Sequence, residues 1–471
     1  MENKGSRFKI LFNTALYFPI YALFIVIFVY WSSINWHTSF NNGYEEVLFP
    51  WVIASLIINM IGFVFIKKVK YVDIGLIFVL CSYLFMFGHV FLKAFNLKTT
   101  LTWNPSIYFD ETVKFHAGVY AVVCLTLISC GCMMINPTKK IITNVADESQ
   151  RRRIIASSGW IFLIVGLIAN VITFGKVILA TLASNSYASY TSANTSGFAD
   201  DLAYLLVPGI LYLFCSRTLT KRKRSFLLLT SITYFVATMV FSGSRKTQLF
   251  AILTIILCYL WTRDRTKLNA KAILLLCITG VLFINLIYVI RENRFDLATI
   301  IPKYFESLGS LKFLSAIIGE TFAEAGLSFY SVVAIVGNVP SVFSFEYGMT
   351  IVRTIPSILP IGWLVGDFFN KAASSYVINK YTGLPVGTSM LGDFYWNWGI
   401  VGGAIAALIF GVVISKISKR IESDIRKETL YFSMLYILLI GIRAGIFELF
   451  RPLVMVTLVP AIIQKIILRK L

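Results

Sequence analysis

The stretch that decides the fold is GTSMLGDFYWNWG, residues 387–399, which runs directly into the apolar IVGGAIAALIFGVVIS, residues 400–415. The apolar half is typical of a helix that crosses a bilayer. The first half sets one carboxylate, Asp393, among aromatic and amide side chains at the point where a long polar segment meets the membrane. An ordinary membrane boundary carries only a few interfacial aromatic residues. The stretch therefore predicts a binding site built onto the end of a membrane helix.

The composition of the whole chain is that of a multi-pass membrane protein. Of its 471 residues, 57% are hydrophobic and 14% are charged, with a mean hydropathy of +0.77. Repeated apolar runs predict an all-α membrane helix bundle of about twelve spans, folded as a single integral membrane domain over residues 1–471. The expected spans are 10–31, 48–66, 72–92, 115–135, 154–174, 202–214, 225–241, 249–261, 272–290, 391–415, 430–447 and 453–467.

The segment 295–386 is the one long stretch without a clear span. We expect it to form an extracytoplasmic loop region of amphipathic helices that lie on the membrane or dip into it. Within it, residues 315–336 are apolar enough to insert but carry Glu320 and Glu324, so whether they cross the membrane is left open.

The net charge of +20 reflects membrane orientation. When alternate loops are assigned to opposite sides, the entire basic excess falls on one side and the other side is neutral, which is the pattern expected of cytoplasmic loops. This places both termini in the cytoplasm, predicts contact with membrane lipid, and argues against a nucleic-acid partner. The seven cysteines fall in spans or at their cytoplasmic ends, which excludes an extracytoplasmic disulfide. Cys130-Gly131-Cys132 lacks metal-ligand spacing, and we interpret it as a helix-packing segment.

Six arginines are expected at or near the outer face, against the usual charge bias. They are Arg245, Arg291, Arg294, Arg353, Arg443 and Arg451. For any single arginine, the simpler explanation is that its side chain extends to the membrane surface and forms a salt bridge there. Arg443 is the sharpest case because it interrupts an apolar run, where a charge at the bilayer centre costs about 2.5–3.5 kcal/mol on insertion scales. It requires a partner such as Glu448 or a bound polyanion, and guanidinium groups suit phosphate oxygens.

Three carboxylates are candidate bases. Glu320 and Glu324 are four residues apart and would share a helix face, or else form a polar stripe on an interfacial helix. Asp393 lies beside Tyr395, Trp396, Asn397 and Trp398. Aromatic rings together with an amide and a carboxylate are typical of a sugar-binding surface, and the alternative is an aromatic belt.

Other motifs limit the chemistry. Two of the three histidines, His89 and His116, lie near the outer ends of their expected spans and could share an outer site. The sequence contains no zinc-protease, paired-aspartate or phosphate-loop motif, so we expect neither a metal nor another cofactor and no ATP-driven pump.

Several motifs together resemble a known family. They are the turn Phe241-Ser242-Gly243-Ser244-Arg245, the pattern Tyr347-Gly348 followed by Arg353-Thr354-Ile355-Pro356 and Pro360, the segment 387–399 with Gly402, and Arg443 in a late span. In these the chain resembles the Wzy-type O-antigen and capsular polysaccharide polymerases over residues 225–452. Asp393 stands where the family pattern has Glu, and Trp398 stands where it has Phe.

The resemblance implies a metal-independent, GT-C-like membrane glycosyltransferase of the bacterial plasma membrane with its active site on the outer face. It would move a growing glycan from undecaprenyl diphosphate to the non-reducing end of another lipid-linked repeat unit, with a chain-length regulator and a flippase as further partners. The six arginines would hold diphosphates, Asp393, Glu320 or Glu324 would assist the acceptor, and residues 395–398 would bind sugar.

Two alternatives remain open from the residues. A lipid-linked glycan ligase shares the donor but uses another acceptor, and it would be expected to rely on an outer-loop histidine, which 295–386 lacks. A transporter or flippase should show paired broken helices with charges near the bilayer midplane. A purely structural scaffold explains neither the arginines nor the long loop.

Overall fold

The computed structural model describes residues 4–38, 40, 43–67, 69, 72–99, 104–134, 145–184, 198–242, 246–263, 302, 312–358, 368, 371–384, 386–418 and 425–470. Within these residues every regular element is a helix, which confirms the predicted all-α class. The expected span 272–290 and three of the predicted arginines, Arg245, Arg291 and Arg294, lie outside the described residues.

The membrane bundle is built from helices of different lengths. They are α1 (Lys4–Ile34), α2 (Tyr44–Ile61), α3 (Ile74–Ala94), α4 (Glu111–Met133), α5 (Val145–Ser184), α6 (Phe198–Ala203), α7 (Leu206–Ser216), α8 (Lys221–Ser242), α9 (Lys246–Arg263), α17 (Met390–Ser418), α18 (Ile425–Ile440), α19 (Ile446–Leu453) and α20 (Val459–Lys470). In the described part of the chain, 8 helical stretches are long and apolar enough to cross a membrane, so the expected count of about twelve is not confirmed. The expected spans 225–241 and 249–261 form the helices α8 and α9, neither of which is among those eight.

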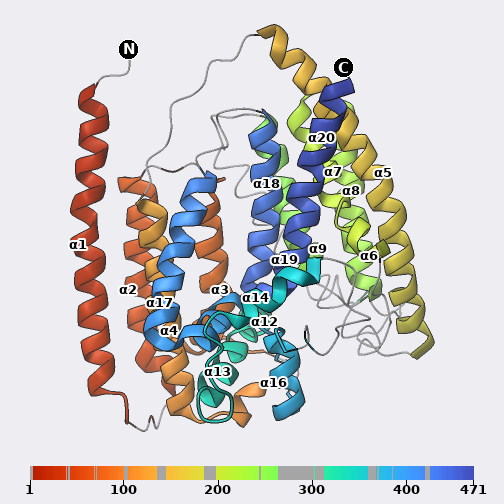
Figure 1. Cartoon of the computed structure of the whole chain (residues 1–471). Helices are drawn as coiled ribbons and strands as arrows, with labels where there is room; N and C mark the ends of the chain where they lie inside the picture. Colours follow the sequence, from red (N-terminus) through yellow and green to blue (C-terminus); the bar gives the residue numbers. More distant parts are fainter. Residues whose placement is uncertain are drawn as a thin grey trace.

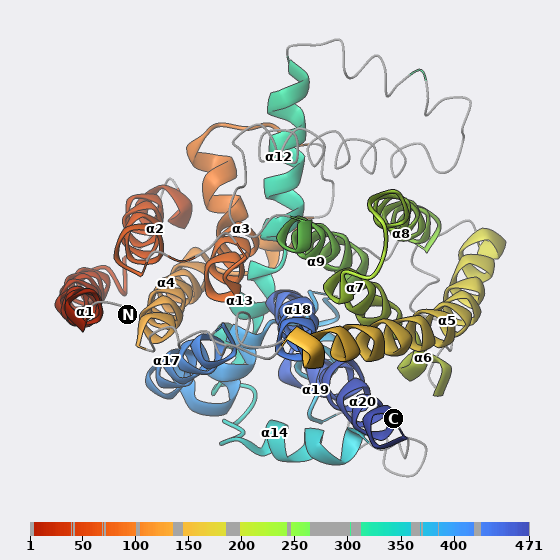
Figure 2. The same cartoon turned by 90° about the horizontal axis from the view of Figure 1, so that it is seen from above.

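The helices form two groups that meet at α18. Seen along the bundle, α1–α4 and α17 lie on one side, α5–α9 and α20 on the other, and α18 between them (Figure 2). The second group contains a small apolar core of its own, in which Phe162 of α5 meets Tyr212 of α7 edge to face, with ring centroids 5.4 Å apart. α18 contacts α7 and α9 on one side and α3 on the other. The position of α18 matters because the site lies where that helix ends.

Small residues bring α4 and α17 into backbone contact. A Cβ atom added to Gly131 would lie 2.3 Å from the carbonyl oxygen of Leu408, and one added to Gly411 would lie 2.1 Å from that of Ile128. In lipid, no hydrophobic force drives helices together, so they associate by close packing, which small residues allow. The interpretation of residues 130–132 as a helix-packing segment is therefore confirmed.

We expect Gly411→Ala to destabilise the protein. The added methyl group meets backbone, which cannot move away as a side chain can, and overpacking typically costs about 1–3 kcal/mol. Thermal unfolding of the purified protein in one detergent measures the effect. Gly175→Ala in α5 is the matched control, because nothing lies within 4 Å of its added Cβ. Equal melting temperatures for the two variants would contradict the proposed contact.

The short helices gather at one end of the bundle. They are α12 (Lys312–Gly326), α13 (Phe329–Asn338), α14 (Met349–Thr354) and α16 (Ser374–Thr382). α1 begins and α20 ends at the opposite end (Figure 1). The expected apolar segment 315–336 is two helices, α12 and α13, separated at residues 327–328. Neither is among the helical stretches long enough to span.

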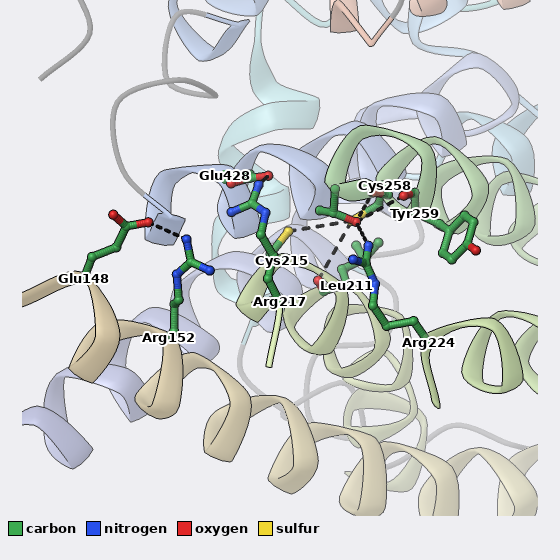
Figure 3. Close-up of polar contacts among 10 residues, drawn as sticks. Glu148, Arg152, Leu211, Cys215, Arg217, Arg224, Cys258, Tyr259 and Glu428 are labelled. Carbon is green, nitrogen blue, oxygen red and sulfur yellow. Dashed lines mark hydrogen bonds and ion pairs between the residues drawn. The ribbon is translucent and has the colours of Figure 1, made fainter. Parts of the chain in front are cut away.

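The end opposite the short helices carries basic side chains that are tied into the helix bundle (Figure 3). Arg217, which ends α7 with a left-handed φ of 55°, donates to Glu428 of α18 at 2.7 Å. Arg224 donates to the Thr262 hydroxyl at 2.6 Å, and Arg152 pairs with Glu148 at 2.7 Å. The first contact joins α7 to α18 and the second joins α8 to α9, whereas the Arg152–Glu148 pair lies within α5.

Candidate active site

The helix that carries Arg443 is broken at that residue. α18 ends at Ile440, a single 3₁₀ turn covers Gly441–Arg443, Ala444 is extended, and α19 begins at Ile446. The prediction of one continuous span over 430–447 is therefore wrong. The physical reason is the close approach of Asp393: a Cβ at Gly445 would lie 2.6 Å from its Oδ2. Gly445 permits this approach, which a larger residue would exclude.

Asp393 joins three segments at this break. Its Oδ2 accepts a hydrogen bond of 2.5 Å from the backbone N–H of Ile446, in the first turn of α19. Its Oδ1 accepts from the hydroxyls of Ser374, at 2.5 Å, and Thr388, at 3.5 Å. The side chain is 1% exposed. A carboxylate at a helix N-terminus satisfies a free N–H and interacts favourably with the helix dipole, so Asp393 fixes where α19 starts.

The aromatic stretch after Asp393 is a short helix that turns at Gly399. Gly399 has a φ of +65°, which favours glycine, and it separates residues 390–398 from the rest of α17. A Cβ there would lie 3.3 Å from the Phe345 ring. The predicted helix over 391–415 is thus present but is bent just before its apolar part.

The predicted sugar-binding residues lie inside this end of the bundle. Asn397 is fully buried, and its Oδ1 accepts from the Gly348 N–H at 2.9 Å and the Thr350 hydroxyl at 3.0 Å. Tyr395 packs edge to face on Tyr120, with ring centroids 5.2 Å apart. Trp396 is also buried, and Trp398 is partly buried. These side chains hold α17 to α4 and α14, and their contact with sugar stays a prediction.

The three described arginines lie on neighbouring elements of this end. Arg353 of α14 donates to Glu346 at 2.6 Å, and Arg451 of α19 pairs with Asp201 of α6. The Arg443 guanidinium lies over the Phe85 ring, 5.4 Å from its centroid. α14 contacts α19, and the 3₁₀ turn bearing Arg443 contacts α3 and α17. The structure thus brings these three arginines to one end of the bundle, and two of them pair with carboxylates of the chain.

Glu320 and Glu324 both lie on α12, which packs against α3. The Thr99 hydroxyl donates to Oε2 of Glu320 at 3.0 Å, and Glu320 is 9% exposed. The structure therefore gives Glu320 a partner in the segment that follows α3, whereas Asp393 contacts α16 and α19. The predicted catalytic carboxylates form two separate groups in the described part of the chain.

Glu448, which the sequence suggested only as a partner for Arg443, lies close to Asp393. It lies in the first turn of α19, half-buried, and its Oε1 accepts from the Ser375 hydroxyl at 3.2 Å. Ser375 follows Ser374, the partner of Asp393, so the two carboxylates share one stretch of α16. The sequence signal for its place in a first helical turn is Gly445, a helix N-cap three residues before this acidic residue.

Comparison with protein families decides the class. The family model described as O-antigen polysaccharide polymerase Wzy matches residues 17–471, nearly the whole chain. The chain belongs to the Wzy polymerase family. No curated protein and no solved structure matches it.

The Wzy match covers every predicted site residue, including the three arginines outside the described residues. In the described ranges, no group of three or more His, Cys, Asp or Glu side chains is arranged to hold a metal ion. What this Wzy protein brings together around the helix break is a guanidinium, two carboxylates and a helix start. Such an arrangement could bind an anionic group and place a carboxylate beside it.

Proposed function

We propose that this Wzy protein is a repeat-unit polymerase of the bacterial plasma membrane. It transfers the growing glycan from undecaprenyl diphosphate to the non-reducing end of another lipid-linked repeat unit. The observation that carries the proposal is the family match over residues 17–471. The position of Arg443 in a broken helix supports it, because a charged residue within membrane segments usually serves function.

We further propose that the reaction takes place on the outer face, with both termini cytoplasmic. Basic residues cluster where α5 begins, α7 ends and α8 begins, as in Arg152, Arg217 and Arg224 (Figure 3). Cytoplasmic loops are the ones enriched in Lys and Arg. α17 runs from Asp393 toward Lys416, so Asp393 lies at the other, proposed outer, end of the bundle.

In the proposed reaction, the acceptor hydroxyl oxygen attacks the anomeric carbon of the growing chain. The bond from that carbon to the diphosphate oxygen breaks, and undecaprenyl diphosphate leaves with the electron pair. Arg443 stabilises the negative charge that develops on the leaving group, helped by Arg245, Arg291, Arg294, Arg353 and Arg451. Glu448 takes the hydroxyl proton, because it is more exposed than Asp393 and lies beside it.

The remaining predicted residues have supporting roles in this proposal. Asp393 positions α19, and with it Glu448 and Arg451. Glu320 and Glu324 lie on α12, away from the α16–α19 contacts, and we assign them to the acceptor side. Tyr395, Trp396, Asn397 and Trp398 shape the wall of the site. No metal or cofactor takes part.

The test is purified protein in lipid nanodiscs supplied with undecaprenyl-diphosphate-linked repeat units alone. We expect a ladder of longer lipid-linked chains and released undecaprenyl diphosphate, without ATP or nucleotide sugar. Products that appear only when a second acceptor lipid is added would indicate a glycan ligase. Lipid movement without new glycosidic bonds would indicate a flippase. A chain-length regulator, added to the same system, should narrow the ladder without being required for it.

A further inference from the structure

A polar cavity lies at the end of the bundle that carries Asp393. It has a volume of about 240 Å³ and opens between the start of α2, the end of α3 and the start of α13. Seven of its nine lining side chains are polar, among them Glu45, His89, Lys93, Asn104 and Tyr330. Polar groups that line a cavity need hydrogen-bond partners, which water or a hydroxyl-bearing ligand can supply.

His89 is held rigidly at this cavity. Its Nε2 is buried and has no hydrogen-bond partner among the described residues. A Cβ added to Gly326 of α12 would lie 2.7 Å from the backbone nitrogen of His89, so α12 packs directly on this turn of α3. The His89 ring lies 5.0 Å from the Tyr330 ring. A buried imidazole nitrogen without a partner is costly unless a ligand supplies one.

The cavity has the chemistry that recognises sugar. Tyr330 supplies an aromatic ring, and burial raises the pKa of its phenol above the usual range, so the hydroxyl stays protonated. Asn96 and Asn104 add amide groups, and the single carboxylate of Glu45 is balanced by the ammonium of Lys93. A balanced lining favours a neutral ligand over an anion such as diphosphate.

The size of the cavity limits the ligand to one ring. Its volume far exceeds the roughly 10–15 Å³ that admits one water molecule. It is below the roughly 300–1,000 Å³ of pockets that take drug-sized molecules. A whole repeat unit would therefore not fit, and one monosaccharide of it would.

The cavity is connected to Asp393 through α13. Tyr330 lines the cavity, and Ile335 of the same helix packs against Gly392, where an added Cβ would lie 2.6 Å from its Cδ1. Five helical residues correspond to about 7.5 Å along the axis. The cavity and the segment that carries Asp393 therefore contact neighbouring turns of α13.

We propose that this cavity, between Glu45, His89 and Tyr330, is a subsite for one neutral sugar ring of the repeat unit, away from the bond that is made. The proposal rests on the proposed polymerase function. The ring comes either from the donor chain or from the acceptor unit, since both present the same sugars. In either case the subsite selects which repeat unit is polymerised, and it makes His89 and Tyr330 specificity-determining residues.

The experiment measures binding and turnover separately. The probe is the repeat-unit oligosaccharide released from its lipid, and equilibrium dialysis gives its Kd for purified protein in nanodiscs. For His89→Ala and Tyr330→Phe we expect the Kd to rise about tenfold, the equivalent of one lost hydrogen bond. We expect a similar rise in KM with kcat nearly unchanged. Separate titration of donor chain and acceptor unit shows which of the two KM values moves.

Two further variants guard against misfolding and non-specific effects. Lys93→Ala removes a half-exposed side chain whose nearest ion pair, with Glu46, is 3.9 Å long, so it should fold normally even if His89→Ala does not. His37→Ala, an exposed histidine just beyond the end of α1, is the matched control and should bind as the wild type does. Unchanged Kd values in the three cavity variants would overturn the subsite. Wild-type protein that binds the oligosaccharide but forms no polymer would instead refute the polymerase proposal alone.

Discussion

Replacing Arg443 with alanine lowers the polymerisation rate by about 10²–10³-fold, the usual effect of removing one group that stabilises developing negative charge. The fold should survive, because the cation–π contact of Arg443 with Phe85 is worth only about 0.5–2 kcal/mol. Chain-length ladders from reconstituted protein measure the loss. Arg443→Lys should retain part of the activity, since it keeps the charge but loses the planar fork that binds two phosphate oxygens.

Arg152→Ala is the control for this experiment. Arg152 is another arginine of the helix bundle, but it lies at the opposite end and forms a salt bridge with Glu148. We expect its ladder to match the wild type. An unchanged ladder for Arg443→Ala, at equal protein in the membrane, would refute the central role of the helix break.

Asp393→Ala should destabilise the protein by about 2–4 kcal/mol, because it removes the acceptor of the part-buried Ile446 N–H and of the buried Ser374 hydroxyl. Asp393→Asn keeps an oxygen at the same place and should lose much less stability. If Asp393 acts by positioning α19, the asparagine variant also retains most of its activity. Thermal unfolding and reconstituted turnover, measured on the same preparations, separate the two effects.

Asp110→Ala provides the comparison for Asp393. Asp110 is likewise an aspartate at a helix start, the N-cap of α4, but it is exposed and its side chain makes no capping hydrogen bond. We expect its melting temperature to stay close to that of the wild type. A stable, inactive Asp393→Asn protein would show instead that Asp393 itself accepts the proton, and would displace Glu448 from that role.

Much of the bundle could be predicted from hydropathy alone, because apolar length determines which helices can cross a bilayer. The importance of residues 387–399 was also predictable, since a carboxylate among aromatic rings at a membrane boundary is unusual. The burial of Asn397 could not be predicted from the sequence. Its partners, Gly348 and Thr350, lie 49 and 47 residues earlier in the chain, and no local pattern reports such a pairing.

The helix break at Arg443 shows a second limit of sequence reasoning. Residues 430–447 have the length and apolar character of one span, and Gly441 and Gly445 are tolerated in membrane helices. What breaks the helix is a long-range contact, the Asp393 carboxylate against Gly445 and the Ile446 N–H. A hydropathy profile shows that Arg443 is unfavourable in a membrane helix, but it cannot show the tertiary contact of Asp393 with Gly445 and Ile446.

The hydrogen bond from Ile446 to Asp393 can form only late in the synthesis of the chain. Chains are made from the N-terminus, so Asp393 and Ser374 are synthesised more than fifty residues before α19. The Asp393 carboxylate obtains its last donor only when the final hairpin has entered the membrane. A nascent chain that ends before α19 therefore carries Arg353 of α14 but lacks the Ile446 N–H that completes the hydrogen bonds of Asp393.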